Sequence, residues 1–223
     1  MPAMGQPRPT HQRKKGGPTF SEDSATVVHR APDLLICNLA SPAGSLLVVV
    51  GHGPGEPYGE DTIRQWWVDA TDIVSMHHKP DRPTILLFDA NGRVGSCTSA
   101  SVGGVQAEFE TTGGSGIHEL ARRTGTFLPA TFLRSEKDGK TWISADKSTH
   151  KRIDYVGIPL EWFSNTISAG VFPQIDLGLL RADHSVTEAT ISGVNLGSTC
   201  LHQLQRLPFD KAKFQLPDAR AAF

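Results

Sequence analysis

Short apolar runs separated by polar turns dominate the chain, and one long amphipathic segment interrupts them. Residues 33–39 (DLLICNL) and 46–50 (LLVVV) are typical of strands, and the turn between them predicts an antiparallel hairpin. From Glu60 to His78 apolar residues recur at helical spacing, and Pro80 lies just beyond the end. The pattern therefore predicts an α/β protein in which a helix packs on a sheet.

The next apolar run, Thr84–Phe88, has the composition of a strand buried on both faces. It ends in the polar turn Asp89-Ala90-Asn91-Gly92. Because Asp89 and Asn91 are two positions apart, an extended backbone would place their side chains on the same side. A buried strand that delivers an acid and an amide to its carboxyl end is typical of a site in a layered α/β protein. A simple Asx turn with a solvated Asp and Asn is the structural alternative.

The second half of the chain is richer in predicted strands. The glycine-rich residues 92–116 predict a loop, and 117–123 a short helix. Further strands are predicted at 126–134 and 140–144, joined as a hairpin by the turn 136–139, and at 151–158 and 186–191.

Titratable side chains stand at the ends of several of these strands. His52 follows the strand at 46–50, and Asp183-His184 precede the strand at 186–191. Asp154 lies among apolar neighbours in a predicted strand, where a charge has to be paired or bound to a cation. A lone histidine at a strand end is more often a structural hydrogen-bonding group, so the series of such residues carries the functional hypothesis.

Composition limits the functional classes. The chain has 223 residues and a formal net charge of −1, so no global basic field indicates nucleic-acid binding, although a metal ion could supply positive charge locally. Cys37, Cys97 and Cys200 show neither zinc-site spacing nor a disulfide framework, which favours a reducing compartment. The sequence contains no apolar run long enough for a membrane span and no secretory signal. We expect an intracellular protein without a membrane partner; the pattern does not distinguish nucleus from cytoplasm.

Composition also suggests the domain limits. Residues 1–25 are rich in proline, glycine and basic side chains and predict a disordered leader. Residues 26–193 form the predicted domain, and 194–223, which show little periodicity, are interpreted as a tail or linker.

Four of these strand ends together resemble the endonuclease/exonuclease/phosphatase superfamily, also called DNase I-like. The motifs are matched in order by His52-Gly53-Pro54, Phe88-Asp89-Ala90-Asn91, Arg152-Ile153-Asp154-Tyr155 and Ala182-Asp183-His184-Ser185. Thr131-Phe132, Thr141-Trp142 and the tail residues Pro208-Phe209-Asp210 resemble the retrotransposon-type endonuclease branch. The resemblance implies a four-layer α/β/β/α sandwich of two mostly antiparallel sheets.

The resemblance also implies a hydrolysis of phosphodiesters that depends on Mg²⁺ or Mn²⁺, with DNA as the substrate. We predict no obligate protein partner. Hard cations take oxygen ligands, so carboxylates must cluster. The implied roles are a metal site at Asp183 and Asp89, activation of water by Asp89, and phosphate contacts from Asn91, His184 and His52. Asp154 is implied to accept the other N–H of His184 and to keep that imidazole charged.

The sequence departs from the family pattern in its first half. Members begin with a strand carrying an Asn and a second strand ending in a metal-binding Glu, whereas Glu22-Asp23, the acidic pair upstream of His52, follow a Pro-Gly-rich segment. We therefore expect that the first strands are missing, that a sheet exposes apolar area or an unpaired edge, and that the metal site lacks a carboxylate. Phe88 in place of Gly is expected to add bulk near the site, and Ala182 in place of Ser removes a hydroxyl.

These departures leave three hypotheses open. The first is an active metal-dependent endonuclease of retroelement type. The second is a catalytically dead remnant that binds nucleic acid or protein, and the third is a phosphatase of small phosphoesters.

Overall fold

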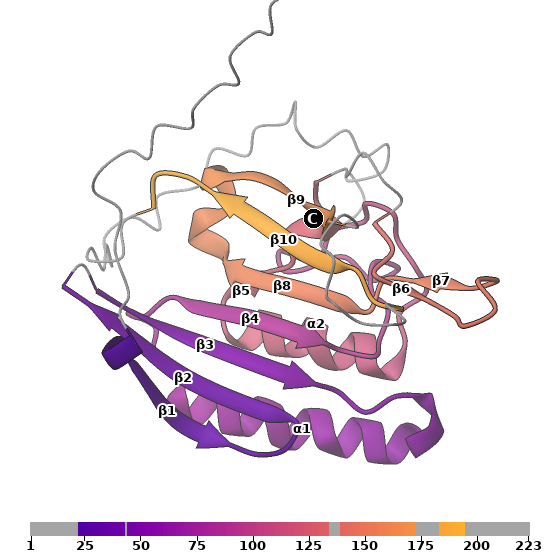
Figure 1. Ribbon diagram of the computed structural model, residues 1–223, viewed down its shortest axis with the longest axis horizontal. Coiled ribbons are helices and arrows are strands. Elements are labelled where there is room, and N and C mark those ends of the chain that lie inside the picture. The colour runs from indigo at the N-terminus through magenta and orange to yellow at the C-terminus, as the bar shows by residue number, and fades with distance from the viewer. Residues whose placement is uncertain (1–21, 43, 134–138, 173–182, 195–223) are drawn as a thin grey trace, which may run out of the picture.

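The computed structural model describes residues 22–42, 44–133, 139–172 and 183–194. In this part of the chain a mixed sheet packs against two helices (Figure 1). In spatial order its strands are β1 (Ala25–Arg30), β2 (Leu34–Ser41), β3 (Gly44–His52), β4 (Thr84–Asp89), β8 (Asp154–Pro159) and β5 (Thr126–Phe127). β3 and β4 are parallel, and the other neighbouring pairs are antiparallel.

Two smaller strand pairs lie beside this sheet. They are β9 (Thr166–Phe172) with β10 (Val186–Ile191), and β6 (Trp142–Ile143) with β7 (His150–Lys151). Short 3-10 turns connect the elements: η1 (Glu22–Ser24), η2 (Glu56–Tyr58), η3 (Pro129–Thr131) and η4 (Leu160–Asn165). The α/β class predicted from the sequence is confirmed, and the four-layer sandwich stays a prediction.

Helix α1 (Glu60–His77) forms where the periodicity predicts it. Ile63, Trp67, Ala70 and Val74 are buried, as expected for one stripe of an amphipathic helix. This stripe packs against one face of the sheet, and alternate strand residues complete the main core: Leu34, Ile36, Leu47, Val49, Leu86 and Phe88. The predicted hairpin is confirmed as β2 and β3.

Helix α2 (Thr112–Arg123) begins earlier than the sequence predicts, because glycines in its first turns permit close packing. A Cβ on Gly116 would lie 2.1 Å from the Trp67 ring of α1, and one on Gly114 would lie 1.8 Å from the carbonyl oxygen of Arg93. The Thr111 side chain accepts a hydrogen bond from the Gly114 N–H and caps the helix. Gly113, Gly114 and Gly116 are therefore contact positions within the helix rather than part of a loop.

The predicted hairpin between 126–134 and 140–144 is wrong in its pairing. β5 ends at Phe127 and pairs with β8, whereas β6 pairs with β7. The predicted strand at 151–158 is divided by Arg152, which is 2% exposed. Its guanidinium donates hydrogen bonds to the carbonyl oxygens of Ala130, Val105 and Gln106, so the backbone leaves the ladder between β7 and β8.

Strand β4 is buried on one face, not on both. Leu86 and Phe88 point toward the helices, whereas Leu87 on the opposite face is 39% exposed. The expectation that Phe88 adds bulk near the site is also wrong. Its ring stacks on Trp67 and fills the space above Gly51, where a Cβ would lie 2.1 Å from a ring carbon.

Other predictions fall outside the described residues: the leader up to residue 21, most of the turn at 136–139, Ala182, and the tail from 195. Within the described ranges, no helix has both the length and the apolar character needed to cross a bilayer.

The helix–sheet packing predicts a contrast between two valines of α1. Val74 is fully buried, so Val74→Ala should lower the free energy of unfolding by about 2 kcal/mol. Val68 on the same helix is 50% exposed, so Val68→Ala should change it by less than about 0.5 kcal/mol. Urea denaturation of both variants measures the difference, and equal losses would contradict the assigned face of α1.

Candidate functional site

Strand register assembles a row of polar side chains across the sheet. His52 is the last residue of β3, Asp89 the last of β4, and Asp154 the first of β8. His52 is the register partner of Asp89, and Asp89 is the partner of Asp154, so the three side chains lie on one face. That face is opposite the helices, because Phe88 and Tyr155 next to the acids point into the helical core.

His184, which lies just before β10 in the sequence, joins this row. An isolated bridge to Trp142 and a hydrogen bond from the Ser185 N–H to the Thr141 carbonyl oxygen (2.7 Å) hold its backbone against β6. Its Nδ1 lies 3.0 Å from Asp154 Oδ2, and its Nε2 lies 3.9 Å from Asp89 Oδ2. His52 Nε2 lies 3.6 Å from the same Asp89 oxygen. Asp89 is therefore flanked by two imidazoles.

Asp154 is held by Thr141, a residue whose positioning role the sequence analysis did not recognise. Thr141 is 1% exposed, and its hydroxyl oxygen accepts hydrogen bonds from the backbone N–H groups of Ile153 and Asp154, both 3.0 Å long. These contacts fix the start of β8 and the direction of the Asp154 side chain. The Thr141-Trp142 segment was the available signal, but spacing alone does not reveal a contact across 13 residues.

The electrostatics of Asp154 are dominated by burial. Burial raises the pKa of its carboxyl, the hydrogen bond with Thr141 lowers it, Asp89 raises it, and His184 lowers it, with a net upward shift. The two carboxylates therefore repel each other in a site that only partly solvates them.

Asn91 does not continue the strand as the spacing predicts. Its φ is +45°, its N–H donates to Asp89 Oδ1 (3.0 Å), and its side-chain amide donates to the Gly53 carbonyl oxygen (2.9 Å). Asn91 thus ties the turn after β4 to the loop after β3, beside Asp89. Asp183 is exposed, and its carbonyl oxygen accepts a hydrogen bond from the Ile143 N–H (2.9 Å).

The donor atoms suit a hard divalent cation. Among the described residues, one group of possible ligands has its atoms within 4.8 Å of one another, and it consists of Asp89, Asp154 and His184. Two facing carboxylates, one with a raised pKa, are stabilised by a nearby cation. Mg²⁺ is commonly held by one or two carboxylates together with substrate phosphates. Of the two ligands expected from the sequence, Asp89 belongs to this group and Asp183 lies outside it.

Lys151 lies at the rim of this cluster and was not singled out from the sequence. Its Nζ is 3.3 Å from Glu56 Oε1 and 5.7 Å from the centre of the Trp142 ring. Trp142 is in turn bridged to His184. The contacts connect the loop after β3 with the β6–β7 hairpin next to His184.

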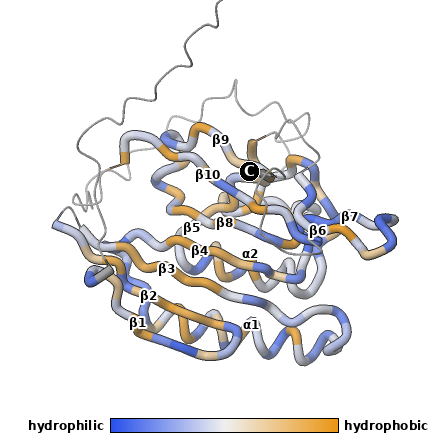
Figure 2. Tube along the Cα trace, viewed as in Figure 1, coloured by the Kyte–Doolittle hydropathy of each residue, from blue (hydrophilic) through white to orange (hydrophobic). Residues whose placement is uncertain are grey.

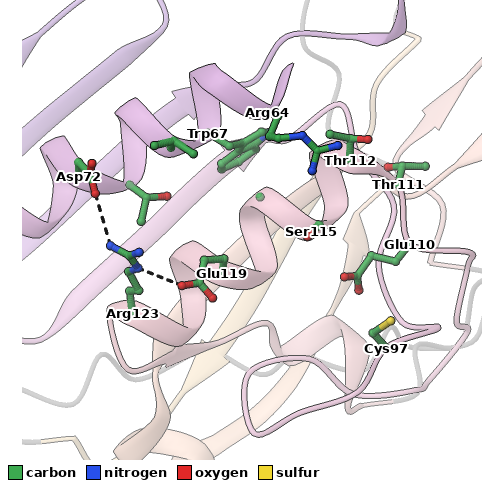
Figure 3. Close-up of a pocket in the computed structure, with 13 residues that line it drawn as sticks. Arg64, Trp67, Asp72, Cys97, Glu110, Thr111, Thr112, Ser115, Glu119 and Arg123 are labelled. Atoms are coloured by element: carbon green, nitrogen blue, oxygen red, sulfur yellow. Dashed lines mark hydrogen bonds and ion pairs between the residues drawn. The ribbon is translucent and has the colours of Figure 1, made fainter. Parts of the chain in front are cut away.

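A separate cavity of about 420 Å³ lies between α1 and α2 (Figure 3). Arg123 at the end of α2 pairs with Glu119 (2.9 Å) and with Asp72 of α1 (3.4 Å) along its wall. None of the described residues that line it belongs to the cluster around Asp89.

The raised pKa of Asp154 predicts a pH-dependent stability difference. Because the folded protein holds this proton more tightly than the unfolded chain, ionised Asp154 lowers stability as the pH rises above its ordinary value of 3.8. Asp154→Asn should therefore raise the Tm at pH 7, and the gain should shrink toward pH 4. Asp69→Asn on the exposed face of α1 is the control. A lower Tm for Asp154→Asn at pH 7 would show that pairing with His184 outweighs burial.

No protein-family model and no curated protein matches this sequence. Several solved structures do match. The endonuclease domain of TRAS1, a telomere-specific non-LTR retrotransposon, is 16% identical, with a TM-score of 0.51 over 78% of this chain and 71% of that one. The 3′-5′ exonuclease NExo from Neisseria meningitidis is 13% identical, with a TM-score of 0.53 over 78% and 70%. An AP endonuclease from Archaeoglobus fulgidus is 10% identical, with a TM-score of 0.54 over 79% and 72%.

At identities of 10–16% the likeness is one of fold. The three solved proteins are nucleases. This chain shares their mixed α/β fold over the 78–79% of its length that these comparisons cover.

Proposed function

We propose that the chain is a divalent-metal-dependent phosphodiester hydrolase that acts on DNA as an endonuclease of retroelement type. The observation that carries the proposal is the approach of Asp89, Asp154 and His184 to within 4.8 Å on a fold shared with DNA nucleases. A structure of NExo bound to a product DNA hairpin supports DNA as the substrate class.

Hydrolysis requires that water attack the phosphorus as the bond to the leaving oxygen breaks, that the proton of the water be removed, and that the charge on the leaving oxygen be stabilised, which a divalent cation can do. Asp89 is the base in this proposal, because its carboxylate stands at the centre of the cluster and is 18% exposed. A bound Mg²⁺ or Mn²⁺ would be held by Asp89 and Asp154, with Asp183 as a further candidate ligand, and would neutralise charge on the phosphate.

In this proposal the two imidazoles bind the phosphate. His184 directs Nδ1 to Asp154, so its Nε2 is left to donate to a phosphate oxygen, and the paired carboxylate stabilises the charged ring. His52 is more exposed, with 68% of its side chain accessible, and contributes a second imidazole at the entrance. Asn91 uses one amide hydrogen on Gly53 and has the other for the scissile phosphate.

Two observations favour the alternatives. The ligand group among the described residues holds two carboxylates and no glutamate, as expected for an inactive remnant that only binds nucleic acid or protein. NExo is also described as a 3′ phosphatase, which keeps hydrolysis of phosphomonoesters as a second candidate. Comparing a supercoiled plasmid, a 3′-phosphorylated oligonucleotide and a small phosphoester as substrates separates the three.

Removal of the cluster's side chains should abolish cleavage. We expect Asp89→Ala and His184→Ala each to lower Mg²⁺-dependent nicking of supercoiled plasmid at least about a hundredfold, because each removes a group that acts in the transition state. The same loss is expected for Asp183→Ala if that carboxylate binds the metal. Asp69→Ala, on the far side of the sheet, should nick as the wild type does. Unchanged nicking by His184→Ala would refute its assigned role.

Metal binding should also be visible without activity. Mn²⁺ at about 100 times its Kd should stabilise the folded protein by about 2.7 kcal/mol, which raises the Tm. Asp89→Asn removes a ligand charge and should abolish this increase, whereas Asp69→Asn should retain it. An equal increase in all three proteins would place the bound metal elsewhere.

A further inference from the structure

The face of the sheet that carries the site is apolar beyond the site. Alternate residues of β2, β3 and β4 that point away from the helices are Leu35, Cys37, Leu39, Leu46, Val48, Val50, Ile85 and Leu87. Figure 2 shows apolar stretches along these central strands. Val50 is 40% exposed, Leu87 39%, and Val27 on the neighbouring β1 55%. A contiguous exposed apolar surface of this kind marks an interaction site.

The β9–β10 pair covers only one side of this face. β10 contacts β8, and β9 contacts η3 next to β5, so the pair lies over the β8–β5 side of the sheet (Figure 1). Phe127, Ile158 and Trp162 form the small core below it, which is bordered by Leu46 and Ile85. Among the described residues, nothing covers the sheet from there across to β1.

The edge of β10 that faces this open surface is unpaired. β10 forms its ladder with β9 alone in the described part of the chain. An unpaired strand edge beside an exposed apolar face offers backbone hydrogen bonds and a hydrophobic surface to the same segment of polypeptide.

A second copy of the chain is the competing occupant, because it would present the same open apolar face. The β9–β10 pair adds little apolar surface for such a partner: Ser168, Glu188 and Thr190 lie on its outward face, and Ile167 of β9, 65% exposed, is its one large exposed apolar side chain among the described residues. A segment of the same chain is favoured by its attachment at the border of this face.

We propose that residues 195–223 of the same chain bind this face along the free edge of β10. The chain reaches the border of the open surface before this segment begins: Gly193 turns with a φ of +72°, and Val194 packs against the small core that Leu46 and Ile85 border. The first 13 residues of the segment, 195–207, include four leucines and a single charged side chain, Arg206. With 29 residues, the segment is long enough to follow the nine-residue strand β3 and return.

The open apolar surface adjoins the candidate site. Val50 and His52 are two residues apart on the same face, as are Leu87 and Asp89, which places each apolar residue about 7 Å from its polar neighbour. Whatever covers Val50 and Leu87 therefore ends beside the site.

The native thiols test the proposal without any activity measurement, so its outcome is independent of the proposed function. Cys37 lies on the apolar face, as the register partner of Val48, and Cys97 is exposed in the loop after β4. In the Cys97→Ser, Cys200→Ser protein, Cys37 should react slowly with a maleimide. Adding Leu201→Asp and Leu204→Asp should speed that reaction at least about tenfold, because charges in the segment weaken its binding to the apolar face.

In a chain ending at Val194, Cys37 should react faster by the same factor. If one of the two variants folds poorly, the other still measures the effect of losing the bound segment. Cys97 in a Cys37→Ser, Cys200→Ser protein is the control, and its rate should not depend on the segment. Equal Cys37 rates with and without the segment would overturn the proposal. Protection of Cys37 from the maleimide that grows with protein concentration and persists in the chain ending at Val194 would also overturn the proposal, because it would indicate binding of a second copy.

Discussion

The site depends on the register between three strands. Pairing of His52 with Asp89 and of Asp89 with Asp154 sets three titratable side chains in one row. A slip of one residue at either interface would turn one of them toward Trp67 and the helical core, because side chains alternate between faces. The core on the opposite face fixes this register. Leu86 and Phe88 are buried beside Asp89. Tyr155 is buried beside Asp154, and its single hydroxyl hydrogen is shared between the carbonyl oxygens of Arg152 (2.7 Å) and Gly92 (3.0 Å).

The electrostatics of the row explain why a cation belongs there. Asp154 is 17% exposed and faces Asp89, and its pKa is raised mainly because burial disfavours the charged carboxylate. His184 compensates one carboxylate through the 3.0 Å contact, but Asp89 has only longer contacts to imidazole nitrogens. A site with an excess of negative charge and partial solvation binds divalent cations and, through them, phosphate oxygens.

The sequence was informative where a local pattern controls the outcome. Helix α1, strand β4 and the β2–β3 hairpin follow from periodicity, and the polar residues at strand ends identified the members of the row. The pairing of β5 with β8 rather than with β6 could not be predicted, because β5 and β8 are distant along the chain. The break between β7 and β8 could not be predicted either, because it occurs at Arg152, a charged residue whose buried guanidinium donates hydrogen bonds to three backbone carbonyl oxygens. The start of α2 was missed because glycines usually indicate a loop, whereas here Gly116 is selected by contact with Trp67.

Within the site, too, some features follow from the sequence pattern and others depend on contacts between distant segments. The pairing of His184 with Asp154 follows from the family resemblance, and the structure has both atoms at hydrogen-bond distance. The roles of Thr141 and Lys151 depend on contacts with Asp154 and with Glu56, respectively, which spacing along the chain does not encode. Asn91 was expected on an extended backbone but adopts a positive φ, since its side chain bonds to Gly53.

The central claim is that Asp89 and Asp154 hold a divalent cation beside His184. Anomalous scattering from crystals of the protein soaked in Mn²⁺ tests it most directly. The account predicts a peak between the two carboxylates, within coordination distance of an oxygen of each, for which Mg²⁺ takes about 2.0–2.1 Å. A peak elsewhere, or none at this position while Mn²⁺ is bound at another site, would contradict it.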